Sequence, residues 1–411
     1  MSWRSALLAG TIIAGLPAVS LAQTCPPNAF PFSQACINAA DLNNAFNALI
    51  QGTTILYLPQ GQTNPTVPGI VMTPGGVAVP NINSTQTMGF NEVEALDFAN
   101  GWGTWVIGTG EYQGEGSNPP RSALITNNAS GFVIKPLANR SLKFSNIQVR
   151  CNGAAAAGCM NVDSMMKGRI TAEGAEFVQG VTTATSATCV WYLNAHTAIP
   201  NEGNTSIVDS HLEFGNVAIQ PPTSGTGQAP LCVNLAGGAV NNNWMLALEI
   251  NGENSANYGF IVYGTNGVNG FGGNILNFPH THQSKIAGIQ IGLNGTNAAF
   301  YGQNLYNLGT VNPSAGDGIN TYTSSDIMRV GVISNAEGAV TNGVKLQTGA
   351  SKNEITVGNI AGASTPLSDS SGVTTNVVKN GTAYLVPPAV TCPTGAPTSS
   401  FASINGIVTH C

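Results

Sequence analysis

Three glutamates recur along the middle of the chain at nearly equal spacing. Glu213 lies 37 residues after Glu176, and Glu249 follows 36 residues later. Neighbouring carboxylates repel one another and split their pKa values, which suits one to act as a general acid and another as a base. Hydrolysis of a glycosidic bond needs two such groups about 5 to 10 Å apart. The glutamates are therefore candidate catalytic residues.

Other polar residues near the glutamates extend this hypothesis. Asp209 and His211 lie on the same segment as Glu213 and are further catalytic candidates. A lyase would instead need a cation near a neutralised carboxylate to abstract a sugar proton, and Lys167 and Arg169 are available for that or for substrate binding. The alternative is that all these residues form a solvated wall without catalysis.

Aromatic side chains near the same segments are candidate platforms for sugar rings. Trp191, Tyr192 and Trp244 are the three that we assign to substrate binding. Ordinary core packing is the competing interpretation, because aromatic residues bury large areas wherever they lie.

Two histidines, His280 and His282, are separated by one residue, which places them on one face of a strand. Two histidines alone lack a third metal ligand, so no metal site is predicted. The commoner explanation is a pair of surface histidines.

These residues lie among short apolar segments between about residues 144 and 360, separated by Asn, Gly, Ser and Thr. No segment keeps a helical period, so we expect strands. Aligning residues 169–177 with 206–214 places Ile170 over Ile207 and Phe177 over Phe214. Imperfect repeats of this kind predict an all-β solenoid in which these pairs stack and the three glutamates form one outer column.

The beginning of the chain has apolar residues at helical spacing over 41–49, followed by the segment Ile55-Leu-Tyr-Leu-Pro-Gln-Gly61. This arrangement resembles the amino-terminal cap of the pectate lyase-like superfamily. The resemblance implies a single-stranded right-handed parallel β-helix over residues 62–386, with a cap helix and first strand in residues 23–61. The Asn-Thr-Asp, Asp-Asp and Gly-His-Gly strings of its polygalacturonase-type members do not occur, which argues against a pectin hydrolase.

The composition argues against nucleic acid as a partner. Only 8% of the 411 residues are charged, and 13 Lys and Arg face 19 Asp and Glu, so a nucleic-acid-binding surface is not expected. Hydrophobic residues make up 42%, which is ample for a folded core.

Residues 1–22 have the basic, apolar and small-residue order of a secretory signal peptide, and no later stretch predicts a membrane span. Eight cysteines follow it, and an even number in an exported chain predicts disulfides. Pairing of neighbours gives Cys25–Cys36, Cys151–Cys159, Cys189–Cys232 and Cys392–Cys411. The last pair would staple a tail formed by residues 387–411.

The sequence thus predicts a secreted enzyme that cleaves an extracellular polysaccharide, by hydrolysis rather than elimination because acids outnumber bases around the glutamates. A lyase or epimerase of the same fold and a non-catalytic glycan-binding adhesin are the alternatives. No cofactor is expected, with calcium considered only for a lyase. The sugar and the oligomeric state are left open.

Overall fold

The structure is a computed structural model in which every described element is a β-strand. The described residues are 54–58, 70–72, 88–89, 103–108, 122–126, 403–404, 407–408 and 132–386, the last with gaps at 135–136, 139–140, 146, 152–157, 164, 182, 196–205, 265–269 and 294–301. The expected signal peptide and cap helix lie outside these residues. Within them no helix could cross a membrane.

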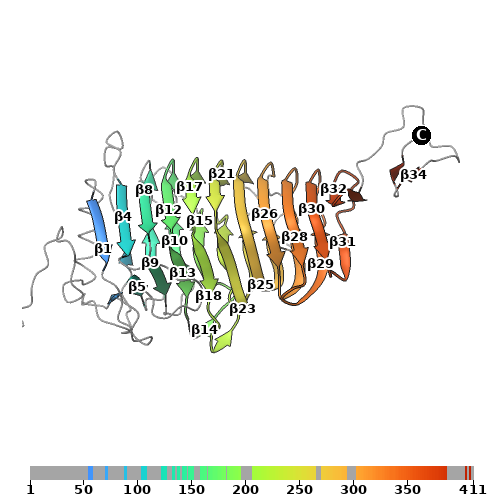
Figure 1. Cartoon of the computed structure of the whole chain (residues 1–411). Helices are drawn as coiled ribbons and strands as arrows, with labels where there is room; N and C mark the ends of the chain where they lie inside the picture. Colours follow the sequence, from blue (N-terminus) through green and yellow to red (C-terminus); the bar gives the residue numbers. More distant parts are fainter. Residues whose placement is uncertain are drawn as a thin grey trace, which may run out of the picture.

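The strands form coils that stack in parallel along one axis, from β1 to β32 (Figure 1). The first strip of the large sheet contains one strand from each coil, and each strand pairs in parallel with the next: β1 (Thr54–Leu58), β4 (Gly103–Gly108), β8 (Ser141–Ser145), β12 (Arg169–Glu173), β17 (His211–Glu213), β22 (Trp244–Leu246), β25 (Ile275–Ile291), β26 (Leu305–Asn312), β28 (Ile327–Ser334), β30 (Glu354–Ala361) and β32 (Val377–Asn380).

Two further strips continue the same coils. The second consists of β2 (Ile70–Met72), β5 (Ser122–Thr126), β9 (Ile147–Cys151), β13 (Glu176–Gln179), β18 (Asn216–Ile219) and β23 (Glu249–Tyr263). The third consists of β3 (Met88–Gly89), β6 (Phe132–Ile134), β10 (Gly158–Asp163), β15 (Cys189–Asn194), β20 (Ala229–Asn234), the ends of β23 and β25, β27 (Ala315–Thr321), β29 (Ala339–Leu346) and β31 (Thr365–Asp369).

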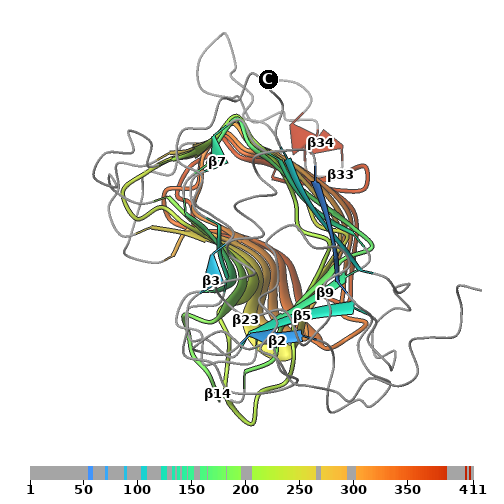
Figure 2. The same cartoon turned by 90° about the vertical axis from the view of Figure 1, so that its left-hand side faces the viewer.

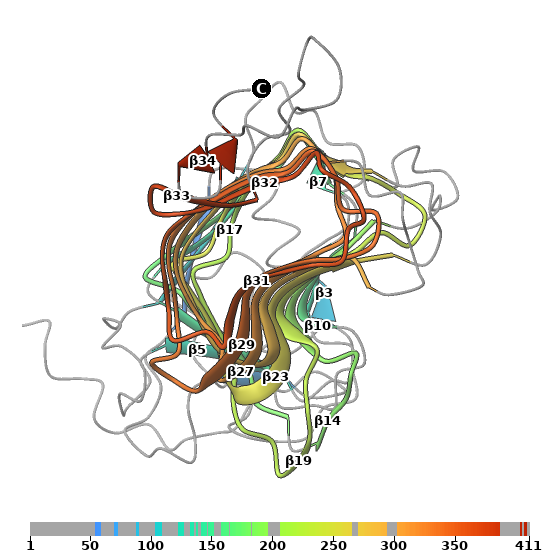
Figure 3. The ribbon, with the colours of Figure 1, turned by 90° about the vertical axis from the view of Figure 1, so that its right-hand side faces the viewer.

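Short strands complete the outline seen along the axis (Figure 2). A five-stranded strip consists of β7 (Leu137–Ala138), β11 (Met165–Met166), β16 (Ile207–Val208), β21 (Val240–Asn241) and β24 (Phe271–Gly272). The pair β14 (Thr183–Ala184) and β19 (Ser224–Gly225) projects from the body (Figure 3). The last strands are antiparallel: β33 (Ala383–Val386) on β32, and β34 (Ser403–Ile404) with β35 (Ile407–Val408). The described part is thus all-β with a long parallel sheet, consistent with a β-solenoid.

The observed register corrects the repeat expected from the sequence. Ile170 lies opposite Leu212 rather than Ile207, and Phe177 lies opposite Val217 rather than Phe214. The distance along the chain from one coil to the next varies, because Arg169 lies opposite His211 (42 residues on) whereas Leu305 lies opposite Ile327 (22 residues on). An alignment without gaps assumes that the loops of successive coils have equal lengths. It therefore paired the wrong residues of neighbouring coils.

The core consists of ladders of apolar side chains that follow this register. One buried row on the first strip is Ile170, Leu212, Met245, Leu276, Tyr306, Met328, Ile355 and Val378. Aromatic rings fill the middle coils, where Trp191 packs edge-on against Phe177 and Phe214 at centroid distances of 4.8 and 5.3 Å. Each rung therefore buries apolar surface against the coil on either side.

A second internal ladder is polar and contains five asparagines and one aspartate. It consists of Asn243, Asn274, Asn304, Asp326, Asn353 and Asn376, all buried at one corner. The Asn274 side chain, for example, accepts bonds from the backbone and side chain of Asn243 and donates to the Val240 carbonyl at 2.8 Å. The residue before each of the first five has a positive φ (Asn242, Gly273, Gln303, Ser325 and Lys352). The ladder thus satisfies the backbone groups of a tight turn that would otherwise be buried without partners.

Two of the expected disulfides are confirmed. Cys151 bonds to Cys159, and Cys189 bonds to Cys232. Cys25, Cys36, Cys392 and Cys411 lie outside the described residues.

Candidate functional site

The first strip carries a hollow of about 630 Å³ on its outer face, which we call the glutamate hollow. It is lined by two carboxylates, Glu173 and Glu213, and by two cations, Lys143 and Arg169. In strands of this strip, side chains alternate between the core and the wall, so Ile170 and Leu212 point inward while the residues on either side of them point outward. The hollow therefore gathers charged groups in a chain that has few of them.

Glu213 is held on two sides within this hollow. Its Oε1 lies 2.8 Å from His211 Nε2, and its Oε2 accepts a bond from the Ala172 backbone N–H at 3.3 Å. The His211 ring stacks on Trp244 in the next coil, with centroids 4.2 Å apart. About a fifth of the Glu213 side chain is exposed (21%), so the carboxylate is both oriented and accessible.

Glu173 is the more solvated of the two carboxylates. It forms an ion pair with Lys143 Nζ at 2.8 Å. The hydrogen bond from Lys143 and the charge of this cation lower the pKa of Glu173. Glu173 is therefore ionised at neutral pH, as a base or nucleophile must be.

A second hollow of about 750 Å³ continues the first along the axis and shares Leu246 with it. Its lining includes Pro279, Gly309, Gly331 and Gly358. A Cβ at Gly309 would lie 2.2 Å from the Pro279 carbonyl oxygen, so only glycine fits there. We call this the glycine hollow.

One outer column runs through both hollows. The register sets Glu213, Leu246, Asn277, Asn307, Arg329 and Thr356 opposite one another in successive coils. At about 4.8 Å per strand, these five steps span about 24 Å. The two hollows together form a groove long enough for several units of an extended polymer.

The expected column of three glutamates is wrong as one ladder. Glu176 lies opposite Asn216, and Asn216 lies opposite Glu249, so these two glutamates are two coils apart, about 10 Å, in one column of the second strip. Glu213 lies on the first strip and shares its hollow with Glu173 instead.

A separate cluster forms around the two histidines. His282 Nε2 lies 2.8 Å from Glu249 Oε1, and His282 Nδ1 lies 3.1 Å from Glu337 Oε1. The His280 ring stacks on His282, with centroids 4.3 Å apart and planes at 4°. Burial lowers the pKa of His282, but the bond to Glu249 and the charge of Glu337 outweigh it and raise the pKa overall. The bond to His282 lowers the pKa of Glu249.

Asp209 and Lys167, expected to take part in catalysis or substrate binding, lie away from the glutamate hollow. Both are exposed corner residues with a φ of 52°. Asp209 Oδ1 accepts a bond from Asn242 Nδ2 at 3.3 Å, and the Lys167 backbone N–H donates to the Val208 carbonyl at 3.0 Å. Neither lines either of the two hollows described above. Their position is set by the turn, whereas Arg169 lines the glutamate hollow.

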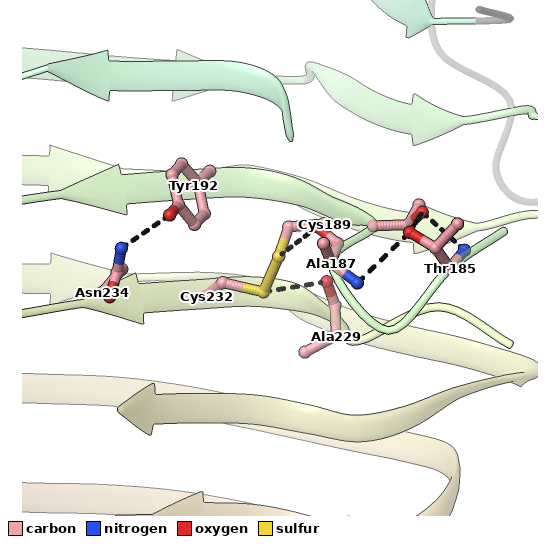
Figure 4. The surroundings of a disulfide bond; sticks show 8 residues. Thr185, Ala187, Cys189, Tyr192, Ala229, Cys232 and Asn234 are labelled. Carbon is pink, nitrogen blue, oxygen red and sulfur yellow. Dashed lines mark hydrogen bonds between the residues drawn. A yellow bond between two sulfur atoms is a disulfide. The ribbon is translucent and has the colours of Figure 1, made fainter. Parts of the chain in front are cut away.

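The three aromatic residues expected to bind sugar lie in different places. Trp191 is fully buried in the core, so it is not accessible to a polymer on the wall. Tyr192 is on the third strip beside the Cys189–Cys232 disulfide, and its hydroxyl accepts a bond from Asn234 Nδ2 at 2.7 Å (Figure 4). Only Trp244, stacked on His211 near the glutamate hollow, remains in a position to contact a ligand there.

Lys143 and Glu337 are two charged members of these sites that sequence reasoning did not identify. Lys143 lies opposite Thr171 on the neighbouring strand, a relation that requires the register. Glu337 contacts His282 although the two residues are 55 positions apart in the sequence.

The chain matches no protein-family model, no curated protein and no solved structure in the comparisons. An assignment of function therefore depends on the chemistry of these sites.

Proposed function

We propose that this protein is a secreted enzyme that hydrolyses glycosidic bonds of an extracellular polysaccharide lying in the groove. The glutamate hollow, with two carboxylates in one accessible recess, is the observation that carries this proposal. The proposal includes a right-handed parallel β-helix of the pectate lyase-like kind, with an amino-terminal cap. The signal-like residues 1–22 and the two disulfides support secretion.

The spacing of Glu173 and Glu213 suits the reaction. Glu213 is on the strand next to Glu173 and is displaced by two residues along it, so their Cα atoms are about 8 Å apart from the strand spacing and rise. Inverting glycosidases hold their two carboxyl groups about 6.5 to 9.5 Å apart, with a water between base and sugar. Rotation of the two side chains can bring their carboxyl groups into this range, so the Cα separation is compatible with an inverting reaction.

The contacts suggest a role for each group. Glu173, kept ionised by Lys143, acts as the base that activates water. Glu213 protonates the leaving oxygen, and His211, whose Nε2 lies 2.8 Å from Glu213 Oε1, orients the carboxyl group. Trp244 and the amides of Asn277 and Asn307 bind neighbouring sugar units.

A second candidate is β-elimination. Arg169 and Lys143 line the same hollow, and Arg329 lines the next one, so a polymer of uronic acids would find cations along the groove. An unprotonated base and a neutralised substrate carboxylate are what this reaction requires.

A digestion panel of neutral and acidic polysaccharides separates these functions. New reducing ends without the ultraviolet absorbance of an unsaturated sugar indicate hydrolysis, and both signals together indicate a lyase. Binding without either signal indicates a glycan-binding protein.

Variants then test the site. Removing general acid–base catalysis costs about 10²- to 10⁴-fold in rate, so we expect that loss for Glu213→Gln and for Glu173→Gln. Glu354→Gln is the matched control, because Glu354 is exposed on the same strip and lines neither hollow. Equal activity of all three variants and the wild type would show that the glutamate hollow is not the catalytic site.

A further inference from the structure

We propose that Glu249, His280 and His282 form a site for one divalent transition-metal ion of the zinc class. Each residue offers one ligand atom, and these atoms all lie within 4.8 Å of one another. The set of two imidazoles and one carboxylate is one that zinc uses in enzymes. It is chemically distinct from the all-oxygen set that calcium prefers.

The fold brings the three residues together from two adjacent coils. His280 and His282 are two residues apart on β25, and the buried Thr281 between them places both on the outer face. Ile250 lies opposite Thr281, so Glu249 and His280, one residue before each, are neighbours across the coils. The strands are paired on both sides, which gives the ligands a rigid base.

The distances require only a small adjustment to hold an ion. Ligands at about 2.0 to 2.2 Å from a tetrahedral zinc lie about 3.4 Å from one another. His282 Nε2 and Glu249 Oε1 are 2.8 Å apart, so a metal would replace the hydrogen bond between them. The stacked His280 ring must turn toward the same point, and its half-buried position leaves room for this.

Glu337 provides an independent indication of a metal site. Its carboxylate oxygens lie 3.1 and 3.2 Å from Nδ1 of His282, the ring nitrogen opposite the one that faces Glu249. A histidine that binds a metal through one nitrogen usually donates the other N–H to a carboxylate, which fixes the tautomer and the ring orientation. The side chain of His282 is only 7% exposed, so this arrangement is built into the wall.

The site lies beside the groove. Leu248, the residue before Glu249, lines the glutamate hollow, and Pro279, the residue before His280, lines the glycine hollow. Three protein ligands leave a fourth position of a tetrahedral ion for water or a substrate oxygen. The inference does not depend on the proposed function, because metal binding is measured directly.

The test uses the purified full-length protein after treatment with a chelator. We expect calorimetric titration with ZnCl₂ to show one site per chain, and titration with CaCl₂ to show none. His280→Ala and Glu249→Gln should weaken zinc binding at least 10-fold. Glu337→Gln should weaken it by about 10- to 100-fold, as loss of an outer carboxylate does.

His211→Ala is the matched control, since His211 also lies 2.8 Å from a glutamate but, among the described residues, has no second histidine beside it. This variant should bind zinc as the wild type does. Because His280 is half-buried, its replacement should leave the fold intact, which circular dichroism checks. With Cu²⁺ as a probe, electron paramagnetic resonance should report two nitrogen ligands in the wild type and one in His280→Ala.

No stoichiometric zinc binding by the wild type would overturn the proposal. Undiminished zinc affinity of folded His280→Ala and Glu249→Gln would overturn it equally.

Discussion

Asp326 is the one acid in the buried asparagine ladder, and replacing it by asparagine should stabilise the protein at neutral pH. Its Oδ1 accepts bonds from the backbone and side chain of Asn304, and its Oδ2 accepts a bond from Thr323 Oγ1 at 2.6 Å. Burial nevertheless dominates and raises the pKa of Asp326 to about 6. The ionised form is therefore unfavourable in the folded state.

The size of the effect follows from this pKa. Asp326 has an ordinary pKa of 3.8, so folding raises it by about two pH units, which corresponds to about 3 kcal/mol. Between pH 4 and 6 the folded state binds more protons than the unfolded state. The free energy of unfolding therefore falls as pH rises through that window and stays low above it. Tyr306, the titratable neighbour, stays neutral because burial and the charge of Asp326 raise its pKa well above the ordinary value.

Asp326→Asn keeps the shape and removes this charge. Its Oδ1 can accept the Asn304 bonds, and its new Nδ2 can donate to Thr323 Oγ1, whose hydroxyl then donates to Thr321 Oγ1, 2.9 Å away. The variant should gain up to about 3 kcal/mol at pH 7 and only about 0.5 kcal/mol at pH 4.

Urea unfolding of both proteins from pH 4 to 8, followed by circular dichroism, measures this difference. Taking the difference between variant and wild type removes the contributions of all other titrating groups. Asp369→Asn, at an exposed position, is the control and should stay within about 0.5 kcal/mol. A variant that is less stable at pH 7, or whose difference from the wild type does not change with pH, would refute the reasoning.

Two further predictions concern packing and crosslinks. Trp191→Ala should cost about 3 to 5 kcal/mol of unfolding free energy because Trp191 fills the core, whereas Trp244→Ala should barely change urea unfolding and should weaken polysaccharide binding. If the two substitutions lowered the free energy of unfolding equally, the reasoning from the different burial of the two side chains would be wrong. Removing the Cys189–Cys232 bond, which closes a separation of 43 residues, should cost about 4 kcal/mol, against about 2.5 kcal/mol for Cys151–Cys159 with a separation of 8. Urea unfolding of the two double Cys→Ser variants checks which disulfide contributes more. A larger loss for Cys151–Cys159 would show that loop-closure entropy does not dominate the stabilisation by these disulfides.

The local features of this protein are predictable from its sequence. The short Val, Ile, Leu and Phe segments between Gly and Asn indicate strands, and the described residues contain strands throughout. The pairing of neighbouring cysteines predicted Cys151–Cys159 and Cys189–Cys232. Strands depend on the alternation of apolar and polar residues over a few positions, and each of these disulfides joins cysteines of the same or the next coil. The local sequence pattern is therefore enough to predict both.

Contacts between residues of neighbouring coils, in contrast, depend on the tertiary structure. Glu213 is in the same hollow as Glu173, rather than in one column with Glu176, because the coil that begins at Arg169 has 42 residues and the next has 33. Glu337 reaches His282 only because every intervening loop has its particular length. Strand propensity does not depend on those loop lengths, but register does, and a shift of a few residues changes every contact between neighbouring coils.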